Sequence, residues 1–155
     1  MALHVKDEEI PRRQRVQKGA TGEGSMVVKK AYGNECSLMI AVRAPGYHTK
    51  PHAHESEQIN YVLEGEIWFF VEEQGFHCKQ GDFQRIPPNK THWAWNRSNQ
   101  SATVAEAHSP ALIGGRSAEG AVGLFAGDEK PSIRGPGENK YVSYDAASAE
   151  RKLGL

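Results

Sequence analysis

Three of the seven histidines in this 155-residue sequence have the spacing of a metal site. His52 and His54 lie two residues apart, so both side chains point to the same face of an extended strand. His92 lies far downstream, just after the turn sequence Pro-Pro-Asn, where we expect a new strand to begin. Imidazole suits first-row divalent metals, and two same-face histidines with a third from a distant strand can hold one. The predicted cofactor is therefore one divalent transition metal: Fe, Mn, Ni or Zn.

Gln58, four residues after His54 at the start of an apolar segment, is the candidate fourth ligand. In the alternative interpretation it only forms hydrogen bonds inside the cavity and leaves a three-histidine site. The amide has no titratable group, so these neutral side chains leave a divalent metal its full double positive charge. Such a metal is a strong Lewis acid that favours anionic oxygen ligands and can polarise a carbonyl.

Proton transfer must then come from other side chains. Glu106 and His108 alternate with Val104 on one face of the last expected strand. Glu106 is a candidate base if it points inward, and a surface carboxylate if it points outward. Tyr47 lies in the loop before His52 and can line the mouth of the cavity. We predict Glu106, Tyr47 and His108 as candidate catalytic residues.

Three further side chains are candidates for binding a small-molecule substrate. Arg85 alternates with Phe83 on its strand and can clamp a substrate carboxylate, and Arg43 can do the same. His48 lies beside Tyr47, in the same loop. The alternative for both arginines is an ordinary place on the surface.

The elements that must position these residues are short strands. Eight segments rich in Val, Ile, Phe, Tyr and Trp follow one another between Ser25 and Ser109: SMVVKKAY, CSLMIAVR, QINYVL, EIWFFV, FHCK, FQRI, HWAW and ATVAEA. Turn residues separate them and no amphipathic helix intervenes, which predicts a sandwich or barrel and excludes a parallel sheet with helical crossovers.

The spacing of the histidines resembles the two sequence motifs of the cupin superfamily, over residues 46–65 and 81–96. The first motif runs through Gly46, His52, His54, Gln58 and Gly65, with every gap matching. The second runs through Gly81, Pro87, Asn89, His92 and Asn96. Asn89 replaces a turn glycine, a mild change because Asn tolerates the left-handed conformation, whereas Gln58 replaces the usual acidic ligand.

The resemblance implies an all-β double-stranded β-helix, the cupin jelly-roll barrel, with the metal inside it. The ligand set looks like that of small cupins that act on unsaturated uronates, and is similar to that of manganese cupins with hydroxynitrile-lyase activity. We expect the barrel to span residues 25–110, preceded by an N-terminal arm at residues 1–24. A C-terminal extension at residues 111–155 would pack on the barrel or on a dimer partner. Within these, residues 19–24 are typical of a linker and residues 145–153 of a helix.

Composition restricts the partners. The chain carries 19 Lys+Arg and 19 Asp+Glu, so its net charge of zero gives no basic surface for nucleic acid or for an anionic membrane. The longest apolar runs, residues 38–42 and 67–71, are far shorter than the roughly 20 residues that span a bilayer. The N-terminus has no signal-peptide pattern, and two cysteines are too few for a disulfide framework. We therefore expect a cytoplasmic protein.

Two expected strands are apolar on both faces. In EIWFFV, Trp68 and Phe70 are as apolar as their neighbours, and in HWAW an inward His92 turns Trp93 and Trp95 outward. Strands of this kind are covered on both faces, by another sheet, the chain's own tail or a second subunit. Because the tail has few large apolar residues, we expect a homodimer.

Three functions fit these residues. The first is a metal-dependent isomerase, cyclase or lyase, in which the metal acts as a Lewis acid on a small carboxylated or keto/hydroxy substrate. The second is a non-haem dioxygenase of the quercetinase-like or diketone- or aromatic-cleaving kind. The third is a cupin that binds a small molecule without catalysis.

Overall fold

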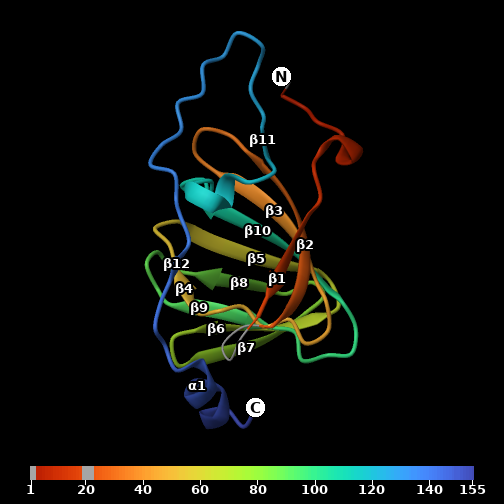
Figure 1. The fold of residues 1–155 in the computed structure, drawn as a ribbon, viewed down its shortest axis with the longest axis vertical. Coiled ribbons are helices and arrows are strands. Elements are labelled where there is room, and N and C mark those ends of the chain that lie inside the picture. Colours follow the sequence, from red (N-terminus) through yellow and green to blue (C-terminus); the bar gives the residue numbers. More distant parts are fainter. Residues whose placement is uncertain (1–2, 19–22) are drawn as a thin grey trace.

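Two β-sheets that face each other make up the barrel (Figure 1). This computed structural model describes residues 3–18 and 23–155. The first sheet has the strand order β1 (Arg13–Gln17), β2 (Gly24–Tyr32), β3 (Ser37–Arg43), β10 (Ala102–Ser109), β5 (Glu57–Glu64) and β8 (Phe83–Ile86), with β11 (Ala121–Gly123) beside β2. The second has the order β12 (Lys140–Tyr141), β4 (His52–Ala53), β9 (His92–Trp95), β6 (Glu66–Val71) and β7 (Gln74–Lys79).

The prediction of an all-β fold is confirmed, and each of the eight expected strands is present. Four strands were not predicted. β1 lies in the expected N-terminal arm and pairs with β2, and the two-residue strands β4 and β12 pair with each other. β11 pairs with β2 in parallel. The predicted linker at residues 19–24 lies mostly outside the described residues, because only its last two are included and Gly24 already begins β2.

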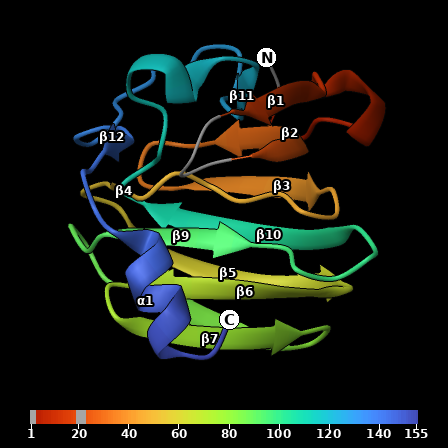
Figure 2. The ribbon, with the colours of Figure 1, turned by 60° about the horizontal axis from the view of Figure 1, so that its bottom comes forward.

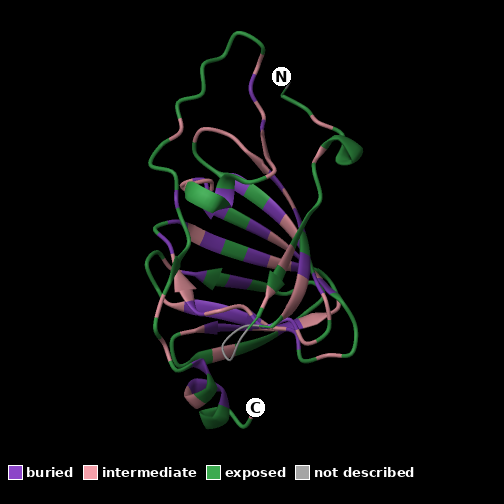
Figure 3. Ribbon diagram, viewed as in Figure 1, coloured by how far each residue is buried: buried purple, intermediate pink, exposed green. Residues whose placement is uncertain are grey.

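Alternation along the strands sorts their side chains into an inner and an outer set, visible as alternating buried and exposed bands in Figure 3. Register then aligns the inner residues of β5, β10 and β3 in rows across the first sheet. The row Val62–Val104–Ala41 is apolar, the next is Asn60–Glu106–Met39, and the third is Gln58–His108–Ser37. The interior is therefore apolar at one end and polar at the other.

The apolar end is a compact core of Val62, Ile67, Phe69, Cys78, Ala94, Ala102 and Val104. Tight turns fit the strands to this core. Gly65 has φ +78°, and a Cβ there would lie 2.7 Å from the Ser101 carbonyl oxygen, so the turn between β5 and β6 needs glycine. Asn89 has φ +61°, which agrees with its replacing a turn glycine before β9.

The C-terminal segment covers the outer side of β6 and β9. Helix α1 (Ala146–Lys152) lies across these strands (Figure 2). Ala146 and Ala149 pack against Phe70 and Trp93, whose rings stack with centroids 5.0 Å apart. The reasoning that favoured a second subunit on this face is corrected, because small alanines let a helix lie close against flat aromatic rings without large apolar residues of its own.

Helix α1 is also held by hydrogen bonds. One carboxylate oxygen of Glu150 accepts from Trp93 Nε1 at 2.8 Å and lies 2.7 Å from His48 Nε2. Asp145 caps the helix, since its side chain accepts from the backbone N–H of Ser148 at 2.9 Å. Two short 3₁₀ helices, η1 (Asp7–Glu9) and η2 (Gly115–Ala118), complete the secondary structure. No helix among the described residues is long and apolar enough to cross a membrane.

Candidate metal centre

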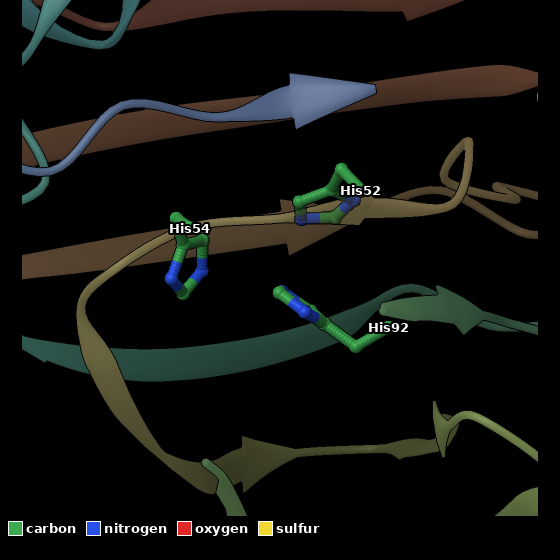
Figure 4. Close-up of side chains that lie close together, drawn as sticks. All are labelled: His52, His54 and His92. Carbon is green, nitrogen blue, oxygen red and sulfur yellow. The ribbon is translucent and has the colours of Figure 1, made fainter. Parts of the chain in front are cut away.

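Three histidines meet at the polar end of the barrel interior. His52 and His54 come from β4 and the residue just after it, and His92 comes from the neighbouring strand β9, directly opposite His52 in the register. One ring nitrogen from each histidine lies within 4.8 Å of those of the other two, and Figure 4 shows the three rings pointing toward a common space. The spacing that predicted a shared site is confirmed as a spatial cluster that could hold a metal ion.

Each of these histidines is oriented by a carbonyl close to it in the chain. The Nδ1 atoms of His52, His54 and His92 lie 2.8 Å from the backbone oxygens of Lys50, Ser56 and Lys90, respectively. A carbonyl can only accept, so each Nδ1 carries the proton and donates it. The Nε2 atoms are thereby left as lone-pair ligands, which is the arrangement typical of metal-binding histidines.

The amide of Gln58 is oriented in the same way by side chains. Its Nε2 donates to Asn60 Oδ1 at 2.6 Å and to Glu106 Oε2 at 3.3 Å. This directs Oε1 toward His54 Nε2, 3.1 Å away. Both atoms are acceptors, so their close approach fits a cation that binds the two together. This contact supports the interpretation of Gln58 as a metal ligand.

Burial keeps these imidazoles neutral, which a metal ligand requires. Removal from water lowers the pKa of His52 to about 4, and it also lowers the pKa of His54. Burial and the neighbouring histidines hold the pKa of His92 well below its ordinary value. Its Nε2 is buried without a hydrogen-bond partner among the described residues, as expected of an atom reserved for a metal.

A cavity of about 110 Å³ adjoins the histidines. Its apolar lining includes Met26, Met39, Phe69 and Ile86. Residues from β1 and from the C-terminal segment, among them Arg15 and Tyr141, also line it. Three cationic side chains and a single carboxylate line it within the described part of the chain: Arg15, Lys30, Arg43 and Glu106. The lining is therefore positive before any metal is added.

Glu106 points inward, and its carboxylate is already engaged. Oε1 forms a buried ion pair with Nη2 of Arg43, and Oε2 accepts from Gln58. Arg43 points inward as well and is only 5% exposed, although the other face of its strand is more apolar. These two residues therefore form the link between the metal ligands and the rest of the cavity.

Tyr47 and His108 also reach the cavity. The Tyr47 hydroxyl and both ring nitrogens of His108 are buried and have no hydrogen-bond partner within residues 3–18 and 23–155. The His108 ring centroid lies 5.6 Å from that of His54, and its Nε2 lies 4.0 Å from Glu106 Oε2. Burial raises the pKa of Tyr47 and keeps the pKa of His108 well below its ordinary value.

Two predicted substrate-binding residues lie elsewhere. Arg85 is on the outer face of β8, because Gln84 and Ile86 on either side of it point inward. Its Nη2 pairs there with Glu57 at 2.7 Å. His48 is turned away from the cavity toward α1 and bonds Glu150. Both assignments are corrected. Arg43 alone among the three occupies the predicted place in the cavity.

Sequence reasoning missed Lys30, a buried residue that lines the cavity. Its Nζ donates to the backbone oxygens of Leu112 and Ser117 at 2.9 and 3.1 Å, and burial lowers its pKa to about 8. Lys30 shares the inner parity of β2 with Met26 and Val28, and that alternation was the only available signal. Asn60, which orients the Gln58 amide, was also missed, and alternation along β5 was likewise its only signal.

Comparison with known proteins identifies the fold. A family model described as a cupin domain matches residues 39–108. Similar solved structures include a predicted oxalate decarboxylase from Thermotoga maritima (19% identity, TM-score 0.60, covering 68% of this chain and 97% of that chain). An RmlC-like cupin from Shewanella frigidimarina is 20% identical, with TM-score 0.55 and coverage of 68% and 88%.

A sugar phosphate isomerase of the cupin superfamily from Silicibacter pomeroyi is 16% identical, with TM-score 0.54 and coverage of 68% and 74%. At these identities the likeness shows a shared fold alone. No curated protein sequence matches this chain. The matching family model, the two facing sheets and the histidine cluster together show that residues 39–108 form a cupin domain.

Proposed function

We propose that the protein is a mononuclear metal-dependent enzyme of the isomerase, cyclase or lyase type, acting on a small carboxylated or keto/hydroxy substrate. The observation that supports this most strongly is the fixed tautomer of the three histidines, which aims three neutral Nε2 atoms at one point with the Gln58 oxygen beside them. A divalent ion held by these groups would act as a Lewis acid on a substrate oxygen.

The other side chains around the cavity have separate roles: orientation, proton exchange and exclusion of water. Glu106 is held by Arg43 and Gln58, which makes it an orienting group rather than a free base. Among the described inward groups with unpartnered polar atoms, Arg43 stays protonated and His92 is a candidate metal ligand, so we assign proton exchange with the substrate to His108 and Tyr47. The apolar side chains of Met39, Phe69 and Ile86 exclude water from their part of the cavity lining.

Metal analysis tests the proposal. Protein purified without chelators should contain about one equivalent of zinc, nickel or manganese, and should turn over unsaturated uronates under anaerobic conditions. His52→Ala combined with His92→Ala should lose the metal, whereas His77→Ala should keep it because His77 stacks on Trp68 away from the site. Metal content unchanged in the double variant contradicts the site.

The apolar cavity wall is the specific feature that favours a second candidate, the dioxygenase, because an aromatic ring or diketone would pack there. In that case the metal would be iron, and oxygen consumption would accompany turnover of catechols or diketones. A protein that binds metal but turns over neither class, while retaining small molecules, would be a non-catalytic binding cupin.

A homodimer remains part of the proposal, through a different face. The outer side of the first sheet carries adjacent apolar residues that are partly or largely exposed, with Leu38 and Ile59 flanking Ala107 across β3, β10 and β5. Phe83, 72% exposed, extends this surface next to Tyr61. Contiguous apolar surface of this kind is typical of subunit interfaces, and we assign it to a second copy of the chain.

Sedimentation velocity tests the dimer. The wild type at tens of micromolar should sediment as a dimer, and Ile59→Asp as a monomer of unchanged secondary structure. Leu3→Asp, an exposed leucine in the N-terminal segment, is the matched control and should leave the dimer intact. A wild-type monomer, or a dimer in Ile59→Asp, contradicts the assignment.

A further inference from the structure

We propose that Arg43 and Tyr47 form a binding site for a carboxylate group in the same cavity as the candidate metal ligands. The inference rests on the proposed function, because the carboxylate bound here would belong to the substrate whose other oxygen reaches the metal. It is supported by three observations: unpartnered buried donors, the contacts that orient them, and the charge of the cavity.

The donors are the first observation. Arg43 uses Nη2 for Glu106, and its Nε and Nη1 atoms have no hydrogen-bond partner among the residues that the structure describes. The Tyr47 hydroxyl also has no hydrogen-bond partner among these residues, and Tyr47 is fully buried. Buried N–H and O–H groups are nearly always paired, so unpaired donors that line a cavity indicate a ligand with acceptor oxygens.

The orienting contacts are the second observation. The Arg43 guanidinium carbon lies 5.9 Å from the centroid of the Tyr47 ring, which places the two side chains together. Glu106 holds Arg43 with one carboxylate oxygen and the amide of Gln58 with the other. One carboxylate therefore fixes both the arginine donors and the candidate metal ligand, so a substrate bound to Arg43 is placed beside the metal centre. Glu106 is a positioning residue in this arrangement.

Charge is the third observation. Arg43 and Glu106 neutralise each other, but Lys30 and Arg15 also line the cavity, and Lys30 contacts backbone carbonyls rather than a carboxylate. The lining is therefore positive, and a bound dication would add to that charge. An anion is favoured over a neutral sugar or alcohol, and the few donors of Arg43 and Tyr47 suit the two oxygens of a carboxylate.

Binding of pyruvate tests the site, measured by calorimetry and by the 15N-labelled Arg43 Nε–H signal in nuclear magnetic resonance. Pyruvate should shift that signal in the wild-type protein, both before and after loading with zinc. Arg43→Gln should weaken binding by about tenfold or more, and Tyr47→Phe by about threefold, because each removes donors to the carboxylate. Arg85→Gln, an arginine outside the cavity, is the control and should bind like the wild type.

Arg43→Lys provides a second variant if Arg43→Gln does not fold. It keeps a cation for Glu106 but lacks the planar set of donors, so it too should bind pyruvate more weakly. Wild-type affinity in Arg43→Lys and Tyr47→Phe overturns the proposal, as does tighter binding of sulfate than of pyruvate. His52→Ala/His92→Ala separates the carboxylate site from the metal-enzyme proposal, because it removes two candidate metal ligands and keeps Arg43 and Tyr47, so pyruvate should still shift the Arg43 signal. If the wild type binds no metal but the Arg43 signal still responds to pyruvate, the carboxylate site stands and the metal-enzyme proposal fails.

Discussion

Replacing Gln58 by glutamate restores the acidic residue usual at this position of the motif, and its effect can be worked out from two contacts. The amide nitrogen that lies 3.3 Å from Glu106 Oε2 and 2.6 Å from Asn60 Oδ1 becomes a carboxylate oxygen. Two charges 3.3 Å apart would repel by about 5 kcal/mol at an effective dielectric constant of roughly 20. Taking up a proton at pH 7 costs less, about 4 kcal/mol for a carboxyl of ordinary pKa near 4.3.

The metal-free Gln58→Glu protein should therefore hold an extra proton and lose about 3–4 kcal/mol of stability at pH 7. Its folded pKa is raised above the unfolded value, so the folded state binds more protons. The loss relative to the wild type grows by about 1.4 kcal/mol per pH unit above roughly 4.3 and vanishes below that. With the metal bound, the new carboxylate gains a dication as partner, and metal affinity should rise by about tenfold or more.

Urea unfolding of the metal-free protein between pH 5 and 8 measures the first effect, and competition with a chelator at pH 8 measures the second. Gln80→Glu adds the same charge at an exposed position and is the control. Equal stability of Gln58→Glu and the wild type across this range, together with unchanged metal affinity, would refute the orientation of the amide and its role as a ligand.

Three further outcomes follow from the described contacts. Burial lowers the pKa of His52 to about 4, against 6.5 in the unfolded chain, so the unfolded state binds more protons between these values. The metal-free protein should therefore lose up to about 3 kcal/mol of unfolding free energy as the pH falls from 6.5 to 4. A flat profile of urea midpoints across this range would contradict this. Glu150→Ala leaves Trp93 Nε1 and His48 Nε2 without their acceptor and should cost about 2–3 kcal/mol of stability, measured by thermal unfolding. Glu119→Ala, at an exposed position, is the control. An unchanged melting temperature in Glu150→Ala would show that this carboxylate does not hold α1. Asn89→Ala should cost about 1–2 kcal/mol because of its positive φ, while Asn89→Gly should be nearly neutral; equal effects of both would rule out backbone strain as the cause.

The strands of the barrel could be predicted because each one alternates or is uniformly apolar over several residues. β4 and β12 could not be, since each has two residues and exists only through pairing with a distant segment. β1 was missed because its sequence, RQRVQ, is polar and largely exposed, so that only its register with β2 makes it a strand.

The histidine cluster could be predicted from spacing, but the sequence did not show which arginine points into the cavity. In β8, Phe83 and Ile86 have opposite parity, so the sequence does not show whether Arg85 points inward. In β3 the more apolar face, with Leu38 and Val42, is the outer one, and Arg43 points inward. Only the registers with β10 and β5, which align Glu106 with Met39 and with Asn60, determine which face is internal.

The contacts that orient the clustered histidines and Gln58 differ in how they respond to mutation. His52, His54 and His92 are each held by a backbone carbonyl, and a carbonyl is present whatever residue occupies positions 50, 56 and 90. Point mutations there change side chains without removing the acceptor, so the three-histidine part of the centre is robust to mutation. Gln58 depends instead on the side chains of Asn60 and Glu106, either of which a single codon change can remove. The orientation of Gln58 is thus more easily lost by mutation than that of the three histidines.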